Sequence, residues 1–204
     1  MNNDKKEFIY IVVSAPSGAG KTSICKEVIK NNPGIRYSVS YTTRPPRSGE
    51  VNGKDYVFVS ESEFKDMIEK KAFIEWAENY GELYGTPRET MGLGLNDGRD
   101  ILFDVDPRGA KALKANYPDG TFVFVFPPSL DVLKERLKRR GSETEDILKR
   151  RLDKALDEIK EVFWYDYVIF NNRLEESVDC LRAIYLAEKC RRERLVKKIT
   201  QFIG

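Results

Sequence analysis

A glycine-rich run from Ser14 to Thr22 has the clearest chemical signature in the sequence, S-A-P-S-G-A-G-K-T. Glycines at positions 18 and 20 let successive backbone N–H groups turn toward one anion, and a helix starting near Lys21 would add its positive dipole end. Lys21 would then reach the β- and γ-phosphates of a nucleoside triphosphate, while the Thr22 hydroxyl would ligate Mg²⁺. The run therefore predicts a phosphate loop.

One position departs from the usual pattern, G-x-x-x-x-G-K-[ST]. Ala15 stands where the pattern has its first glycine. Alanine is acceptable there only if its φ stays negative. The alternative interpretation is a glycine-rich turn between a strand and a helix, with an incidental lysine. We treat the whole run as candidate nucleotide contacts: Ser14, Ala15, Pro16, Ser17, Gly18, Ala19, Gly20, Lys21 and Thr22.

Short apolar runs that alternate with helical patterns provide the framework for this loop. The first run, at 8–13, directly precedes the loop, and others occupy 101–105, 121–126 and 167–170. Each is typical of a strand that is buried on both faces, and each precedes a helix-like segment. This alternation predicts an α/β fold whose parallel sheet is flanked by helices.

Two stretches interrupt the alternation. Over 37–92 the pattern changes to strand-like pieces, S-V-S-Y-T, D-Y-V-F-V and F-I-E-W-A, around a short helix that starts with a capping box of Ser60 and Glu63. This predicts an inserted α+β subdomain. The charged segment 134–151 predicts an exposed, mobile stretch. We expect a single domain over 1–204, with its core at 7–36, 93–133 and 156–200.

Composition excludes several classes of mechanism. The 204 residues contain no histidine, which rules out Ser-His-Asp and Cys-His nucleophile systems and imidazole metal sites. Lys and Arg number 35 against 33 Asp and Glu, so a general nucleic-acid binder is disfavoured. The odd number of cysteines fits a reducing compartment, and the first apolar run is too short for a signal peptide or a membrane span. We expect a cytoplasmic protein without membrane or specific nucleic-acid partners, either a monomer or a homodimer.

A phosphate loop alone does not specify the reaction, because NTPases, switches, motors and small-molecule kinases share it. Segment 37–92 adds further motifs: T-T-R-P-P-R-S-G-E at 42–50, D-Y at 55–56, F-I-E-W-A at 73–77 and Y-G-T at 84–86. With these motifs behind the phosphate loop, the sequence resembles the guanylate kinase family, whose members phosphorylate GMP with ATP. The resemblance extends from about Ile9 to Glu188 and makes 37–92 the expected GMP-binding subdomain.

The resemblance implies a site for the GMP phosphate. Arg44, Arg47, Tyr56 and Tyr84 match the positions that hold this phosphate in the family, and Glu50 ends the same motif. Guanidinium groups surrounded by phenolic donors suit a dianionic phosphate. The plainer alternative is an exposed turn stiffened by two prolines, followed by an ordinary turn aromatic.

The resemblance also implies a guanine site. Glu75 matches the residue that recognises guanine, which presents its N1–H and its N2 amine side by side to a carboxylate, whereas adenine would present a lone pair. Ser40 and Thr86 match hydroxyl donors to O6, and Asp106 matches a second acceptor near N2. Alternatively, Glu75 is a solvent-facing strand residue.

A metal contact is implied at the end of the strand expected at 101–105. Asp104 matches the acidic residue that orders Mg²⁺ through its waters, while Thr22 would be the direct ligand. Ligands of open α/β sheets gather at the carboxyl ends of the strands. The alternative is that Asp104 caps the helix beginning near Pro107.

The resemblance makes 134–155 a lid, and the remaining implied contacts are with ATP. Arg136 and Arg140 match lid arginines that contact ATP, Arg151 begins the next arm of the lid, and Asn171 matches an adenine contact, although Asn is also common in turns. Phosphoryl transfer spreads negative charge over the moving group, which cations stabilise. The expected catalytic residues are Lys21, Arg44, Arg140 and Arg151.

The resemblance thus implies Mg²⁺-dependent transfer of the γ-phosphoryl group of ATP to GMP or dGMP. The acceptor needs no strong base because a monophosphate oxygen is already anionic. We expect the catalytic groups to be fixed cations, a metal, an amide or low-pKa carboxylates, none of which needs to titrate near neutral pH. Two alternatives remain open: a non-catalytic guanylate-kinase-like module that binds phosphorylated peptides, which would lack parts of the ATP site, and a sugar-phosphate kinase, which would lack the guanine-recognising residues.

Overall fold

The larger of two sheets contains the phosphate loop at the end of one strand. The computed structural model describes residues 8–79, 81–139 and 145–204. Five strands form this sheet in the order β2-β7-β1-β8-β9. Their bounds are β1 (Tyr10–Ser14), β2 (Ile35–Ser38), β7 (Asp100–Val105), β8 (Thr121–Phe126) and β9 (Tyr167–Phe170). The pairs β2–β7 and β8–β9 are parallel, so the expected α/β class with a parallel sheet is confirmed.

The chain forms two compact units, which are described separately. The first comprises residues up to 12 and 34–120. Its smaller sheet has the order β4-β3-β6-β5, with β3 (Tyr41–Thr42), β4 (Val57–Phe58), β5 (Phe73–Asn79) and β6 (Glu82–Pro87). Its helices are α2 (Glu61–Glu69), α3 (Glu89–Asp97) and α4 (Pro107–Asn116). The piece S-V-S-Y-T, expected in one subdomain, divides between the sheets because Ser38 pairs with Phe103 while Tyr41 pairs with Gly85.

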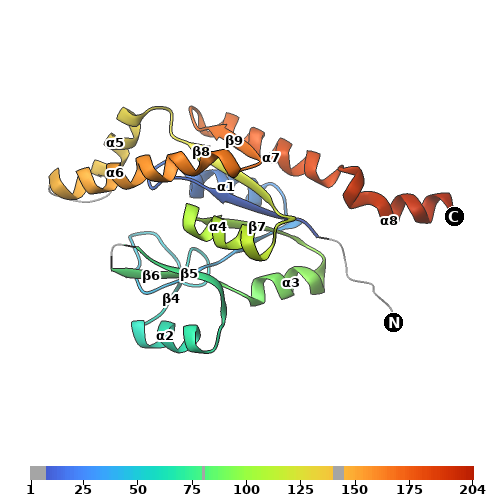
Figure 1. Cartoon of the computed structure of the whole chain (residues 1–204), viewed down its shortest axis with the longest axis horizontal. Helices are drawn as coiled ribbons and strands as arrows, with labels where there is room; N and C mark the ends of the chain where they lie inside the picture. The colour runs from blue at the N-terminus through green and yellow to red at the C-terminus, as the bar shows by residue number, and fades with distance from the viewer. Residues whose placement is uncertain (1–7, 80, 140–144) are drawn as a thin grey trace. The chain divides into compact units, whose positions relative to one another are not determined.

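Helix α2 begins where the sequence predicts. Ser60 accepts from the backbone of Glu63, and the Glu63 carboxylate accepts from the backbone of Ser60, which completes the capping box. Phe64 is the buried residue of this helix and stacks on Phe73 of β5 with ring centroids 4.5 Å apart. This contact attaches α2 to the small sheet, beside which it lies in Figure 1.

The second unit comprises residues 13–33 and 121–204. Its helices are α1 (Lys21–Lys30), α5 (Leu130–Arg139), α6 (Glu145–Lys160), the short 3₁₀ helix η1 (Glu161–Trp164), α7 (Leu174–Lys189) and α8 (Arg192–Ile203). Helices α5 and α6 pack together through Leu133, Leu137, Leu148 and Ala155 (Figure 1). The segment expected as a lid is therefore built largely from two helices that share a small apolar core.

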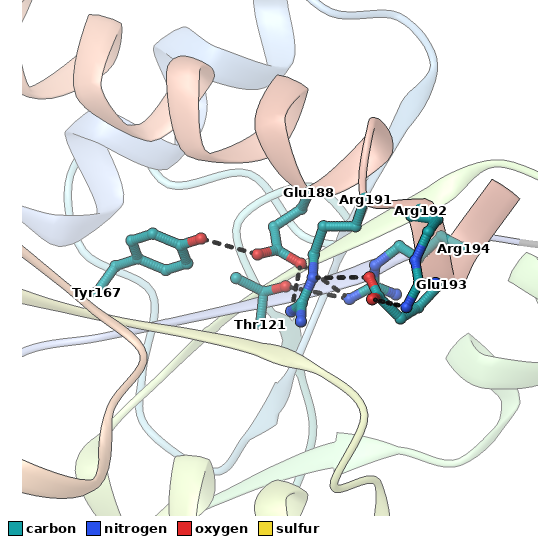
Figure 2. Close-up of polar contacts among 7 residues, drawn as sticks. All are labelled: Thr121, Tyr167, Glu188, Arg191, Arg192, Glu193 and Arg194. Carbon is teal, nitrogen blue, oxygen red and sulfur yellow. Dashed lines mark hydrogen bonds and ion pairs between the residues drawn. The ribbon is translucent and has the colours of Figure 1, made fainter.

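A buried carboxylate connects α7 with the start of α8 (Figure 2). Glu188 is 2% exposed and accepts hydrogen bonds from the Tyr167 hydroxyl at 2.8 Å and from Nη2 of Arg194 at 3.1 Å. Burial raises the pKa of Glu188, but these hydrogen bonds and the charge of Arg191 outweigh it and hold the pKa below its usual value. The cluster anchors the C-terminal helix to the start of β9.

Two general features concern compartment and membranes. Cys25 is buried, Cys180 and Cys190 are exposed, and all three are free thiols. Within 8–79, 81–139 and 145–204, no helix combines the length and the apolar character needed to cross a membrane.

Candidate functional sites

The phosphate loop connects β1 to α1 as expected. Gly20 is the N-cap of α1 with φ 95°, and Gly18 has φ 93°, so both use the left-handed region that favours glycine. Among the described residues, none caps the first turn of α1 through its side chain, and none in that turn is acidic. Its N–H groups and dipole are therefore available to an anion.

Ala15 does not strain this loop. In the described segments Lys71 is the single non-glycine residue with a positive φ, so Ala15 keeps a negative one. The methyl group of Ala15 is buried, with 3% of the residue exposed. The condition under which alanine can replace the first glycine of the pattern is met.

Neighbouring side chains give a second reason for the two glycines. A Cβ atom on Gly20 would lie 2.4 Å from Nδ2 of Asn171, closer than any side chain tolerates. A Cβ atom on Gly18 would lie 3.1 Å from Cδ1 of Leu133 on α5. The loop is thus fitted closely against α5 and the end of β9.

Two of the expected ATP contacts lie against the loop backbone. Nδ2 of Asn171 donates to the carbonyl oxygen of Ala19 at 2.8 Å, and Nη1 of Arg136 donates to the same oxygen at 3.0 Å. The contact of Asn171 with adenine stays a prediction, as does the catalytic role of Arg151, which is half-buried on α6. Arg140 lies outside the described residues.

The residues expected at the metal fit Mg²⁺ in chemical type. Thr22 is exposed in the first turn of α1. In the other unit, Asp104 accepts from the Tyr37 hydroxyl at 2.9 Å, and Asp106, not Asp104, caps α4 by accepting from Gly109 N–H at 2.8 Å. No group of three or more Asp, Glu or Cys side chains in the described chain could hold a metal ion. Mg²⁺ commonly takes one or two protein oxygens together with phosphates and waters, so the Thr22 hydroxyl and the Asp104 carboxylate are each of a chemical type that it binds.

The expected phosphate-binding residues of the first unit form a cluster. Nη2 of Arg44 lies 2.9 Å from both carboxylate oxygens of Glu50. The Arg44 guanidinium lies over the Tyr56 ring, 5.5 Å from its centroid, and Tyr56 meets Tyr84 edge to face at 6.1 Å. Glu50 also accepts from the backbone N–H of Arg47 at 2.7 Å. Glu50 therefore orients Arg44 and closes the turn, while its expected contact with GMP stays a prediction.

The expected guanine-recognising residues meet across paired strands. Glu75 of β5 lies opposite Thr86 of β6, and the Thr86 hydroxyl donates to Oε1 of Glu75 at 2.5 Å. Burial raises the pKa of Glu75 to about 7, hydrogen bonds from Thr86 oppose the rise, and the charge of Asp106 adds to it. Glu75 is therefore not a carboxylate of low pKa, because its packing removes water from it.

Other residues around these sites were not identified from sequence. A Cβ atom on Gly109 would lie 3.1 Å from Cδ of Glu75, so glycine there makes room for the carboxylate. Phe58 presents a second ring to Arg44, at 5.8 Å. The Ser177 hydroxyl lies 3.0 Å from Oδ1 of Asn171 and shares its hydrogen with the carbonyl oxygen of Arg173, also at 3.0 Å. A sequence signal exists for Phe58, which follows Tyr56 by two residues in the run D-Y-V-F-V, but none exists for Ser177.

A sequence model described as guanylate kinase matches residues 8–188. The chain belongs to the guanylate kinase family. Among its relatives, the guanylate kinase of Syntrophus aciditrophicus is 52% identical over 93% of this chain and 91% of its own length. The guanylate kinase of Geobacter metallireducens is 46% identical over 97% of each chain. The crystal structure of guanylate kinase from Anaplasma phagocytophilum is similar at a TM-score of 0.75 and 32% identity, covering 96% of this chain and 97% of that one.

Guanylate kinase family membership confirms the resemblance that the motifs indicated. The match begins at residue 8, before β1, and ends at residue 188, so it includes both clusters described above and the phosphate loop. Helix α8 follows the matched segment.

Proposed function

We propose that this chain transfers the γ-phosphoryl group of ATP to the phosphate of GMP or dGMP, giving ADP and GDP or dGDP. The observation that supports it most directly is the Glu75–Thr86 pair, a half-buried carboxylate and a buried hydroxyl whose chemistry suits guanine. The Arg44–Tyr56–Tyr84 cluster, which suits a phosphate, belongs to the same unit. Base recognition and phosphate recognition are thus provided within one compact unit.

The two guanine-recognising side chains would exchange hydrogen bonds when GMP binds. The Thr86 hydroxyl has one hydrogen, which Glu75 accepts at 2.5 Å. Guanine offers two N–H donors to an ionised Glu75, which frees the Thr86 hydrogen for the guanine O6. Adenine offers no such pair of donors, so the carboxylate would discriminate between the two purines.

The phosphate loop would bind ATP through its backbone N–H groups and the start of α1. Lys21 would neutralise charge on the β- and γ-phosphates. Mg²⁺, when bound, would neutralise the same phosphates, with Thr22 as a direct ligand and Asp104 acting through water. Arg44 would hold the acceptor phosphate, whose oxygen is anionic and needs no base.

The segment 134–155 would act as a lid that excludes water from ATP, with Arg136 and Arg151 supplying positive charge. The same two arginines, together with Lys21, argue against the non-catalytic alternative, because a module that only binds phosphorylated peptides does not need them.

ATP and GMP are intracellular metabolites, and the three free cysteines suit the reducing cytoplasm, where we propose that the protein works.

The test is an assay of ADP formation from ATP with one acceptor at a time. With GMP and dGMP we expect turnover at least a hundredfold above that with AMP, CMP or UMP, and no turnover without Mg²⁺. Equal turnover with the four ribonucleotides would refute the proposed substrate. Absence of turnover with GMP, together with binding of a phosphorylated peptide, would support the non-catalytic alternative.

A further inference from the structure

The carbonyl group of Ala19 accepts two hydrogen bonds from residues far away in sequence. Asn171 donates from Nδ2 at 2.8 Å and Arg136 from Nη1 at 3.0 Å. A carbonyl oxygen has two lone pairs, so both are used. In a trans peptide the C=O and the following N–H point in opposite directions. Donors that fix the Ala19 carbonyl therefore also fix the direction of the Gly20 N–H, one of the groups available to a phosphate.

Asn171 is itself held in one orientation. The Ser177 hydroxyl lies 3.0 Å from Oδ1 of Asn171 and 3.0 Å from the carbonyl oxygen of Arg173, so its one hydrogen is shared between these two acceptors. The backbone N–H of Asn171 donates to the Phe126 carbonyl at 2.9 Å. Asn171 is 5% exposed and Ser177 is 1% exposed, so water cannot readily replace either partner. Because the amide oxygen of Asn171 faces the Ser177 hydroxyl, the amide nitrogen must face the Ala19 carbonyl.

The glycine at position 20 is a second observation that supports the contact between Asn171 and the loop. A Cβ atom at this position would lie 2.4 Å from Nδ2 of Asn171. Glycine is therefore favoured at position 20 for two reasons: the backbone there is left-handed, and the Asn171 side chain leaves no room for a Cβ atom.

We infer that Asn171 and Ser177 are positioning residues, which hold the Ala19–Gly20 peptide in the orientation that binds the nucleotide phosphates. Ser177 acts through Asn171, and Asn171 acts through the Ala19 carbonyl. The inference rests on the proposed binding of ATP by the loop. It differs from an adenine contact because it concerns the phosphates and is independent of the base.

The experiment compares the full-length protein with Asn171→Ala, Ser177→Ala and the double variant by titration calorimetry. The probes are Mg·ATP, inorganic tripolyphosphate with Mg²⁺, and GMP. We expect the dissociation constant for ATP to rise about tenfold in Asn171→Ala and about threefold in Ser177→Ala, from the loss of one buried hydrogen bond each. The double variant should lose no more than Asn171→Ala alone, because the two residues form one chain of contacts. GMP affinity should stay within twofold.

Tripolyphosphate separates this inference from a contact with adenine, since it has no base. An equal loss for ATP and tripolyphosphate supports the inference, whereas a loss with ATP alone would overturn it. Fully additive losses in the double variant would also overturn the role of Ser177. If Asn171→Ala does not fold, Asn171→Asp keeps the shape of the side chain but replaces the amide donor with an oxygen. Unchanged tripolyphosphate affinity in that variant would also overturn the inference.

Ser60→Ala is the matched control because it removes a serine hydroxyl that caps α2 and does not contact the loop. It should lower the stability of the protein through the loss of this cap and leave ATP and tripolyphosphate affinity unchanged. A wild-type protein that binds ATP but does not phosphorylate GMP would contradict the proposed reaction and leave the positioning inference standing. A wild-type protein that binds neither ATP nor tripolyphosphate would overturn both.

Discussion

Thr86 donates its hydroxyl hydrogen to Glu75 across the paired strands β5 and β6, at 2.5 Å. The register of these strands places the two residues directly opposite each other. Glu75 therefore has one partner before any ligand arrives, which lowers the cost of keeping a carboxylate in a place where burial raises its pKa. A ligand that binds at this pair must compete with an existing hydrogen bond, so it has to offer Glu75 hydrogen-bond donors of its own.

Binding of GMP should depend on pH through Glu75. Its pKa is raised to about 7, so the carboxylate that guanine requires is mostly protonated at pH 6 and mostly ionised at pH 8. GMP affinity should therefore rise about tenfold from pH 6 to pH 8. Calorimetry in two buffers of different ionisation enthalpy should detect proton release on binding at pH 6.5.

Glu75→Gln is the control for this pH dependence. An amide accepts through only one oxygen, so the variant should bind GMP at least tenfold more weakly at pH 8 and reject AMP less strongly. The second ionisation of the GMP phosphate, near pH 6, remains in the variant and shows how much of the slope belongs to the ligand. An identical pH profile in both proteins would contradict the role of Glu75.

Glu50→Gln should weaken the binding of GMP by loosening Arg44. The carboxylate holds the guanidinium through two contacts of 2.9 Å and closes the turn at Arg47. We expect KM for GMP to rise about tenfold, the loss of one charged hydrogen-bonded pair, with KM for ATP unchanged. Glu61→Gln is a matched control, because its pair with Lys65 is exposed and worth little. A parallel rise in both KM values would indicate general damage instead.

Lys21→Ala should lower kcat by about a thousandfold or more, because it removes a cation from the transferred phosphoryl group. Helix α1 should remain folded, since alanine favours helix. Lys30→Ala, at the other end of the same helix, removes an exposed lysine and should keep full activity. Circular dichroism checks the fold and the ADP-formation assay checks the rate; near-normal turnover of Lys21→Ala would exclude its charge-stabilising role.

Ala15→Gly restores the usual first glycine of the phosphate-loop pattern. Because Ala15 already has a negative φ, the change adds flexibility to the unfolded chain and removes a buried methyl group. We expect the free energy of unfolding to fall by about 1 kcal/mol with kcat and KM within twofold of wild type. Urea denaturation measures the first quantity. A gain in stability would mean that alanine is strained in the loop after all.

Glu188→Ala should destabilise the protein by about 1 to 3 kcal/mol, because it removes the shared acceptor of Tyr167 and Arg194. The pKa of Glu188 lies below its usual value in the folded protein, so its contribution is present above the usual value, 4.5, and is lost as pH falls through the lowered one. Urea denaturation at pH 7 and at pH 3 should show a smaller difference between wild type and variant at pH 3. Glu193→Ala, an exposed neighbour, should have little effect at either pH.

Local patterns in the sequence were sufficient for several elements of this protein. The start of α1 at Lys21 follows from a glycine-rich turn after a buried strand, and the start of α2 follows from the capping box at Ser60. These signals depend on only a few neighbouring residues, so they can be recognised from the local sequence alone. The order of the motifs predicted the candidate residues for binding phosphate and guanine. Both groups of residues lie in the same compact unit, as that prediction requires.

Contacts between distant segments could not be derived in the same way. Ser177 reaches the phosphate loop only because the end of β9 and the first turn of α7 place Asn171 against Ala19. The piece that was expected as one strand divides between two sheets because pairing partners come from elsewhere in the chain. The pKa of Glu75 is near neutrality because packing removes water and brings Asp106 close, and neither effect is encoded in the residues adjacent to Glu75.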